Sequence, residues 1–240
     1  MIAPSVESVR EQLWVLAHDD DRDLSPLIDR RAIGIGLAGA TLIDLMLSDS
    51  ITIDDGYVYP RQQEPTRTAR HAAGSRSGTR ESPFTTTDPL TASVLYMIRE
   101  LHAVRITDVL RDPSLRLYER TFAALIAAGI VIEHRRTLRS TRYRLDDPAT
   151  SGWVRAQFTR RLYRPVTATA ALDGLCALIW ALNLHSRLVL PYSTAEADTL
   201  LHTIVDELPA RAGPDAPATA IANLAIAVRH AVGDLATSAF

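Results

Sequence analysis

The sequence predicts a mainly α-helical fold, with a helical-bundle core and short peripheral β-hairpins. Apolar residues recur at helical spacing in several long segments, of which residues 31–47 are the clearest. Two helical segments begin with the capping-box pattern Ser/Thr-x-x-Glu, at Ser8–Glu11 and Ser193–Glu196. Strand-like runs are short and are separated by turn residues, so they predict hairpins too small to form a separate domain. These observations together favour a bundle of helices.

The composition is that of one globular domain spanning residues 1–240, because 47% of the residues are apolar and 22% are charged. The single cysteine, Cys176, cannot form an intramolecular disulfide or a four-cysteine metal site, which fits a reducing compartment. The N-terminus lacks the basic and apolar regions of a secretory signal, and no stretch approaches about 18 uninterrupted apolar residues. We therefore expect a cytoplasmic protein whose contact with a membrane is peripheral.

Charge is distributed unevenly along the chain. Every basic residue is an arginine, and there is no lysine. Acidic residues predominate in residues 1–60 and 165–240, whereas arginines predominate between them, most densely in residues 133–164. Codon bias can account for the missing lysines, but it does not place charges along a chain. The arginine-rich middle therefore predicts a surface that binds an acidic partner.

The elements of the N-terminal half follow in order. The capping box at Ser8–Glu11 precedes an apolar run that fits either a helix or a strand, and the acidic stretch Asp19–Asp23 is a solvated turn. After the helix at 31–47, two short strands turn at Asp55-Gly56. Residues 60–89 are rich in Pro, Thr, Ser, Arg and Gly, so we expect a mobile loop there.

Helices are predicted again after this loop, the first at about residues 90–104. The second covers residues 113–128, with Asp112 as its N-cap and Gly129 as its C-terminal stop. Residues 130–145 follow as a hairpin with a basic, polar turn. The remaining helices are expected at about residues 151–163, 168–185, 194–207 and 216–236.

Gly34-Ile-Gly36-Leu-Ala-Gly39 matches the G-x-G-x-x-G of dinucleotide-binding folds. That motif requires a buried strand immediately before it, so that the phosphates meet a helix N-terminus. The preceding residues, Leu27–Ile33, contain three consecutive charges instead, and no alternating βαβ units follow. We therefore interpret these glycines as small residues that let two helices pack closely.

Other patterns that resemble catalytic or metal sites lack essential residues. The run Asp19–Asp23 imitates the start of an EF-hand loop, but Leu24 occupies the position of its glycine. His202 and Asp206 lie one helical turn apart and are interpreted as a surface pair, and Cys176 as a packed apolar residue. We predict no catalytic residue, no metal site and no cofactor.

Two arginines, Arg116 and Arg120, fall one turn apart on the predicted helix and lie next to the arginine-rich hairpin. A helix followed by such a hairpin is also how winged-helix DNA-binding domains end. Clustered arginines bind phosphate groups, whether these belong to DNA or to lipid headgroups. The hairpin arginines are Arg135, Arg136, Arg139, Arg142 and Arg144. We favour a binding surface over a merely solvated face.

Five segments carry motifs in an order that is typical of one protein family. Residues 36–51 read GLAGATLIDLMLSDSI and are similar to the pattern G-L-x-G-x-x-L-x-E-L-x-L-x-G-x-I. The other four are Leu13–Asp20, Thr86–Leu90, Tyr118–Val131 and Ala171–Ala181. These segments resemble the Golgi phosphoprotein 3 family, whose opening apolar segment is a strand ending in acids. The lysine-free form resembles bacterial, actinobacterial-type members.

The resemblance implies one α-helical domain, no catalytic activity, and recognition of phosphatidylinositol 4-phosphate on a membrane surface. In the eukaryotic members a tryptophan and several arginines form the headgroup pocket. The tryptophan position is Asp29 here, one arginine position is Ala38, and two more are Leu115 and Tyr118. Other arginines lie beside these positions, so we expect a looser site for anionic phospholipid.

The residues implied for the lipid headgroup are Arg30, Arg31, Arg116, Tyr118 and Arg120. The hairpin residues expected to face the membrane are Arg135, Arg136, Leu138, Arg139 and Arg142, and the resemblance also implies self-association through the hairpin. We therefore expect a non-catalytic peripheral membrane adaptor that binds anionic phospholipid headgroups. The alternatives are a winged-helix-like nucleic-acid-binding protein and a cytosolic protein–protein scaffold with a protein partner.

Overall fold

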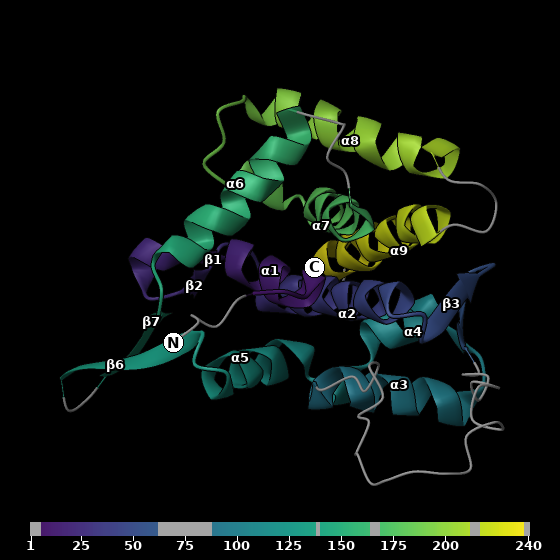
Figure 1. Ribbon diagram of the computed structural model, residues 1–240, viewed down its shortest axis with the longest axis horizontal. Coiled ribbons are helices and arrows are strands. Elements are labelled where there is room, and N and C mark those ends of the chain that lie inside the picture. Colours follow the sequence, from purple (N-terminus) through teal and green to yellow (C-terminus); the bar gives the residue numbers. More distant parts are fainter. Residues whose placement is uncertain (1–5, 62–87, 138–139, 164–168, 212–216, 238–240) are drawn as a thin grey trace, which may run out of the picture.

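The computed structural model describes residues 6–61, 88–137, 140–163, 169–211 and 217–237 (Figure 1). These residues form helices with small antiparallel sheets, so the predicted mainly α-helical fold class is confirmed. The α-helices of the described residues are α1 (Val9–Leu16), α2 (Arg30–Leu47), α3 (Pro89–Leu101), α4 (Ile106–Arg111), α5 (Leu117–Ala127), α6 (Ala149–Tyr163), α7 (Ala170–Ala181), α8 (Thr194–Arg211) and α9 (Pro217–Thr237). The strands are β1 (His18–Asp19), β2 (Ser25–Pro26), β3 (Ile51–Asp54), β4 (Tyr57–Pro60), β5 (Val104–Arg105), β6 (Val131–Thr137) and β7 (Ser140–Leu145).

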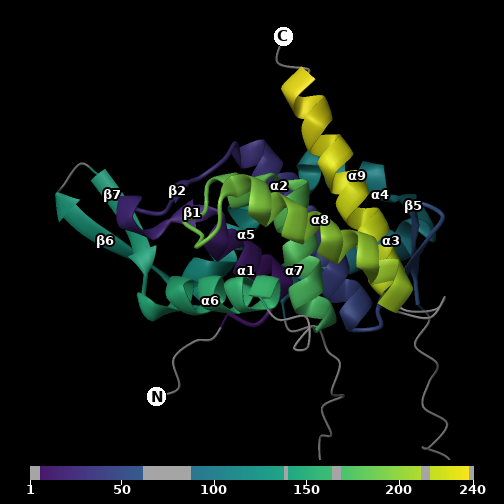
Figure 2. The same cartoon turned by 90° about the horizontal axis from the view of Figure 1, so that it is seen from above.

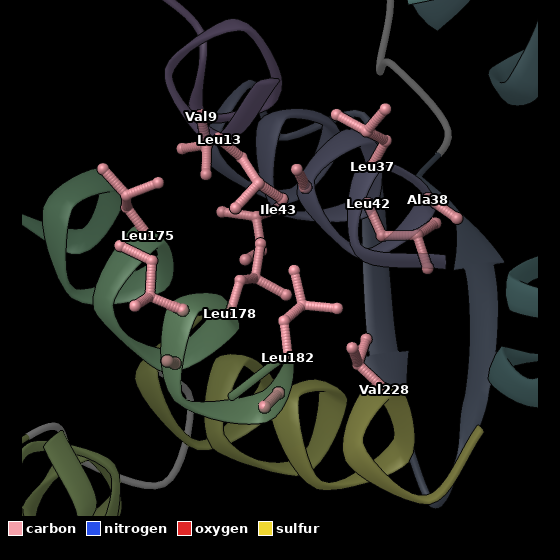
Figure 3. Packing of buried hydrophobic residues seen from close by; sticks show 14 of the residues in the cluster. Val9, Leu13, Leu37, Ala38, Leu42, Ile43, Leu175, Leu178, Leu182 and Val228 are labelled. Carbon is pink, nitrogen blue, oxygen red and sulfur yellow. The ribbon is translucent and has the colours of Figure 1, made fainter. Parts of the chain in front are cut away.

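The central helix of the bundle is α2. Nearly all of its residues between Ala32 and Met46 are buried, and α1, α5, α7 and α9 pack around it. In Figure 1, α7 and α9 lie on one side of α2, and α3, α4 and α5 lie on the other. A helix that is apolar on all sides needs this cover, and Figure 3 shows its side chains meeting those of α1, α7 and α9. Within the described residues, no helix has the length and apolarity needed to cross a bilayer.

Two glycines allow α2 to approach its neighbours. A Cβ atom added at Gly39 would lie 2.9 Å from Cγ2 of Val228 and 3.0 Å from Cδ2 of Leu178. A Cβ atom added at Gly36 would lie 2.6 Å from Cδ1 of Leu182. These distances are shorter than side-chain packing permits, so close helix packing explains both glycines. The predicted packing role is confirmed, and the glycines lie inside a helix rather than after a buried strand.

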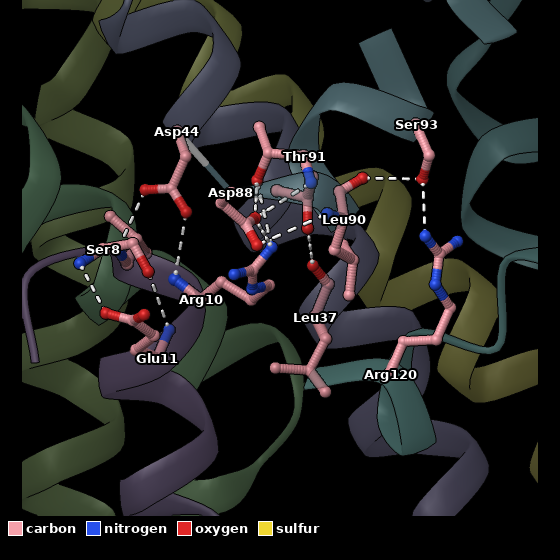
Figure 4. Close-up of polar contacts among 12 residues, drawn as sticks. Ser8, Arg10, Glu11, Leu37, Asp44, Asp88, Leu90, Thr91, Ser93 and Arg120 are labelled. Carbon is pink, nitrogen blue, oxygen red and sulfur yellow. Dashed lines mark hydrogen bonds and ion pairs between the residues drawn. The ribbon is translucent and has the colours of Figure 1, made fainter. Parts of the chain in front are cut away.

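The opening apolar segment is the helix α1. The amide of Glu11 donates to Oγ of Ser8 at 3.1 Å, and the amide of Ser8 donates to the Glu11 carboxylate at 3.2 Å, which confirms the predicted capping box. The amides of Val9 and Arg10 donate to the carboxylate of Asp44 in α2, at 2.9 and 3.2 Å (Figure 4). The strand that the family resemblance implied is therefore wrong for this segment.

A buried arginine of α1 holds the start of α3. Arg10 is 2% exposed and donates to Oδ2 of Asp88 at 2.6 Å and to Oγ1 of Thr91 at 3.0 Å (Figure 4). Asp88 also accepts from the amide of Thr91 and thereby caps α3. Although burial opposes it, the hydrogen bonds from Arg10 and Thr91 hold the pKa of Asp88 at about 2. The contacts of Arg10 thus attach the start of α3, which follows segment 62–87, to the core that contains α1.

Both predicted hairpins are confirmed. Asp55 and Gly56, between β3 and β4, have φ angles of 45° and 76°, as a two-residue type I′ turn requires. The second hairpin pairs β6 with β7 in antiparallel register, and its tip, residues 138–139, lies outside the described residues. The loop expected at 60–89 also lies outside them, except at its two ends. In Figure 2 the β6–β7 hairpin and the C-terminal end of α9 project from the body.

The segment before α5 differs from the prediction. In place of one helix over 113–128, Asp112 caps a single 3₁₀ turn at Pro113–Leu115. Arg116 then adopts the left-handed backbone, with φ 44° and ψ 46°, and α5 begins one residue later. The short elements β5 and α4 complete the connection from α3 and were not expected.

Candidate functional site

A cavity of about 600 Å³ opens where the N-terminus of α2, the turn before α5 and the C-terminal end of α9 meet. We call it the α2–α5 cavity. Its lining residues are Arg30, Arg31, Gly34, Ile35, Val109, Leu110, Arg111, Asp112, Pro113, Arg116, Leu117, Tyr118, Glu119, Ala231, Asp234 and Leu235. The cavity thus has an apolar floor and a rim on which four arginines outnumber three acids.

Three arginines of the rim come from two segments that are far apart in the sequence. Arg30 and Arg31 begin α2, and Arg116 precedes α5, and all three are exposed. The guanidinium carbon of Arg30 lies 5.5 Å from the ring centroid of Tyr118, within the range of a cation–π contact. The fourth arginine, Arg111, pairs with an aspartate of α9. Among the described residues, neither Arg31 nor Arg116 has an acidic partner, so both remain available to an anion.

The N-terminus of α5 also borders this cavity. Arg116 is the N-cap residue of the helix, and no side chain accepts a hydrogen bond from the first turn. The amides of Leu117, Tyr118 and Glu119 therefore lack a capping acceptor, and they carry the partial positive charge of a helix N-terminus. An anion in the cavity would supply the missing acceptor. By contrast, the N-terminus of α2 is capped by Asp29.

Tyr118 is held from behind by a buried histidine. The hydroxyl of Tyr118 lies 3.0 Å from Nε2 of His18, and Nδ1 of His18 lies 2.6 Å from the carbonyl oxygen of Trp14. The His18 ring is stacked on the indole of Trp14, with centroids 3.8 Å apart. Burial and, to a smaller extent, the charge of Arg30 lower the pKa of His18 to about 4, although the hydrogen bond with Trp14 opposes this shift. Burial likewise raises the pKa of Tyr118, although Arg30 opposes that rise.

Three of the four positions that differ from the eukaryotic pocket do not face this cavity. Asp29 accepts from the amides of Arg31 and Ala32 as the N-cap of α2. Ala38 and Leu115 are buried in the core. Of these four positions, Tyr118 alone lines the cavity. The positive charge of the cavity comes from neighbouring arginines, namely Arg30, Arg31 and Arg116, rather than from these four positions.

Arg120 does not lie where its spacing from Arg116 suggested. Its guanidinium donates to Oγ of Ser93 in α3 at 2.9 Å (Figure 4). Arg120 is not among the residues that line the cavity. The left-handed residue Arg116 lies outside the helix, so the two arginines do not share a helical face. The structure thus brings Arg30, Arg31, Arg116 and Tyr118 together and places Arg120 apart from them.

The arginine-rich hairpin is described only in part. The side chains of Arg135, Arg136, Leu138 and Arg139 lie outside the described residues. Arg142 of β7 is described, and its guanidinium lies 3.1 Å from the carboxylate of Asp23.

The partner of Arg142 belongs to the acidic stretch Asp19–Asp23, which connects β1 to β2. A second acid of this stretch, Asp20, lies 4.0 Å from the guanidinium of Arg155 in α6. The acidic stretch is therefore bound both to the hairpin and to α6, rather than being only a solvated turn. Asp19, Asp20 and Asp21 also place one carboxylate oxygen each within 4.8 Å of one another. Asp20 and Asp21 are exposed, and no further His, Cys, Asp or Glu of the described residues belongs to this group.

The remaining chemical candidates have structural roles. Cys176 is completely buried in α7, where burial raises the pKa of its thiol, so it is a packed apolar residue as predicted. His202 and Asp206 form the predicted exposed pair, 2.8 Å apart.

Sequence reasoning missed two features of the cavity. The first is His18, whose signal was its spacing of four residues from Trp14 in the apolar run that became α1 and the following strand. The second is the contribution of α9, whose Asp234 pairs with Arg111 across 123 positions of the sequence. A local sequence pattern cannot predict a contact between residues so far apart in the sequence.

The model of the Golgi phosphoprotein 3 (GPP34) family matches residues 9–235 of this chain. No curated protein matches it.

Proposed function

This chain belongs to the Golgi phosphoprotein 3 family, and from that premise we propose that it is a non-catalytic peripheral membrane adaptor. It binds phosphatidylinositol 4-phosphate or another anionic phospholipid, with the headgroup in the α2–α5 cavity. The observation that carries the proposal is the convergence of Arg30, Arg31 and Arg116 on one cavity at an uncapped helix N-terminus. Guanidinium groups and helix N-terminal amides are the donors that proteins use for phosphate.

The hairpin is the second proposed contact with the membrane. It projects from the body (Figure 2), and its sequence supplies Arg135, Arg136 and Arg139. Each arginine close to an anionic bilayer contributes on the order of 1 kcal/mol. The cavity then provides recognition of the headgroup, whereas the hairpin provides attraction to any anionic surface and a site for self-association.

The nucleic-acid-binding alternative has less support. A helix that reads a DNA groove must be exposed and must present polar or basic side chains. α5 packs on α1, α2 and α3, and its exposed residues include Glu119, Ala123 and Ile126. A cytosolic scaffold with a protein partner is the other alternative, and it predicts no dependence on lipid.

The test is co-sedimentation with vesicles of neutral lipid that contain phosphatidylinositol 4-phosphate. Replacing both Arg31 and Arg116 by Ala should weaken binding roughly 30-fold, since two lost contacts of about 1 kcal/mol add to about 2 kcal/mol. The matched control replaces Arg99 and Arg187, two exposed arginines that do not line the cavity, and changes the net charge equally. Equal loss in both double variants would show that the cavity is not the site.

A second comparison separates recognition from attraction. Replacing Arg135, Arg136 and Arg139 by Ala should lower the affinity for every anionic lipid alike, because these side chains supply charge. The Arg31 and Arg116 variant should instead lose its preference among anionic lipids. Binding to neutral vesicles that survives high salt would overturn the proposal, since exposed charges are screened within about 10 Å at 0.1 M salt. A DNA mobility shift in parallel tests the alternative.

A further inference from the structure

The direction of the hydrogen bonds behind Tyr118 follows from the groups involved. The carbonyl oxygen of Trp14 can only accept, so Nδ1 of His18, 2.6 Å away, must carry a proton. Burial keeps this imidazole neutral at physiological pH, since it lowers the pKa to about 4. The other nitrogen, Nε2, therefore has only a lone pair. The Tyr118 hydroxyl, 3.0 Å from Nε2, must donate its single proton to it.

Because the Tyr118 hydroxyl donates its proton to His18, it cannot donate a hydrogen bond to a ligand in the α2–α5 cavity. The side chain of Arg30 already donates a hydrogen bond to this hydroxyl oxygen. One further lone pair remains, so Tyr118 can accept another hydrogen bond but cannot donate one while its proton is directed at His18. A phosphate oxygen needs a donor, and the arginines of the rim provide it. A hydroxyl group of the ligand, in contrast, finds an acceptor in Tyr118.

We propose that His18 is a positioning residue that fixes Tyr118 as an acceptor, and thereby makes the cavity select a phosphate ester that bears free hydroxyl groups over a bare phosphate monoester. The inference rests on the proposed function and specifies the ligand class of the same site. His18 is suited to this role because it is 2% exposed and is stacked on Trp14, so its ring has one orientation. The ligand does not touch His18 itself.

The test compares two replacements of His18 with nearly the same shape. His18→Gln keeps a hydrogen-bond acceptor at the end of the side chain, whereas His18→Met does not. Vesicles contain either phosphatidylinositol 4-phosphate, whose headgroup has hydroxyl groups, or phosphatidic acid, whose headgroup has none, and are matched in surface potential. His18→Met frees the Tyr118 proton for a phosphate oxygen, so the preference for phosphatidylinositol 4-phosphate should fall about threefold to tenfold, the effect of one hydrogen bond. His18→Gln should retain most of it.

A double-mutant cycle shows whether His18 acts through Tyr118. In the Tyr118→Phe background, both replacements of His18 should leave the lipid preference unchanged, because no hydroxyl remains to be oriented. Thermal unfolding of each variant identifies general damage to the fold, which would lower binding to both lipids alike. If His18→Gln and His18→Met have the same lipid preference in the presence of Tyr118, the proposal is overturned.

A ligand-free measurement keeps this inference separate from the proposed function. Nitrogen-15 NMR of the free protein should find His18 neutral with its proton on Nδ1. A proton on Nε2 would overturn the inference even if the protein binds lipid. If the proton is on Nδ1 but the wild-type protein binds neither vesicle better than neutral ones, it is the proposed function that fails, and the lipid preference with it.

Discussion

Replacing Asp44 by Asn is expected to remove a pH-dependent loss of stability from the protein. Asp44 lies in α2 and accepts from the amides of Val9 and Arg10, so it caps α1 from a neighbouring helix. Burial raises its pKa from 3.8 to about 6, although the hydrogen bonds from both amides oppose the rise. An asparagine has the same shape and does not ionise. Its single amide oxygen can accept from only one of the two amides, so the variant also loses stability by an amount that does not depend on pH.

The raised pKa sets both the sign and the size of the effect. Between pH 3.8 and about 6 the folded protein binds the Asp44 proton more tightly than the unfolded chain does, so stability falls as the pH rises through this window. A shift of about two pH units corresponds to about 3 kcal/mol in all, of which about 1 kcal/mol falls between pH 5 and 7. His18 has the opposite slope in part of this range, because its folded-state pKa is lowered to about 4.

The assay is urea unfolding of the wild-type protein and of Asp44→Asn at pH 5 and at pH 7. Since His18 is present in both proteins, its contribution cancels in the comparison. From pH 5 to pH 7 the wild-type protein should lose about 1 kcal/mol of unfolding free energy relative to the variant. If the unfolding free energy of both proteins changes by the same amount between pH 5 and pH 7, ionisation of Asp44 does not destabilise the fold. Our account of this cap is then wrong.

Two further predictions concern the packing of α2 and the acidic stretch. Gly39→Ala should lower the unfolding free energy relative to Gly34→Ala by about 1–3 kcal/mol, because a Cβ at Gly39 would meet Val228 whereas the nearest atom to one at Gly34 is 4.0 Å away; equal midpoints and slopes in urea would contradict this. Asp23→Asn should bind anionic vesicles more tightly than Asp21→Asn, which removes the same charge, because Asp23 neutralises Arg142 of the hairpin, whereas Asp21 pairs with no hairpin arginine whose side chain is described. Vesicle titration at low and moderate salt measures the difference, and identical affinities would rule out competition between Asp23 and the membrane.

The helices were predictable where their ends carry side-chain signals. The capping boxes at Ser8 and Ser193 both form, and the positive φ of Gly56 matches the predicted turn. The elements that were missed, β1, β2, β5 and α4, are two to six residues long. Segments of this length show too few turns or alternations for a periodic pattern, and their pairing depends on contacts from elsewhere in the fold.

The candidate site was predictable only in part. The family motifs and the arginines beside them led to Arg30, Arg31, Arg116 and Tyr118, which the structure brings to one cavity. Arg120 was misplaced because helical spacing was applied across Arg116, and a left-handed backbone at an arginine has no signature in the sequence. The wall supplied by α9 is a long-range contact, which composition and periodicity do not encode.

The backbone at Arg116 has a consequence for protein engineering. A left-handed conformation costs an L-residue about 1–2 kcal/mol, and a glycine would adopt it without that cost. A design that improves folding alone would therefore select this position for replacement. The same change would delete one of the four arginines that line the cavity and leave the N-terminus of α5 without its neighbouring charge. The proposed site thus includes an arginine on a strained backbone, so stabilised variants are best screened for ligand binding as well as for melting temperature.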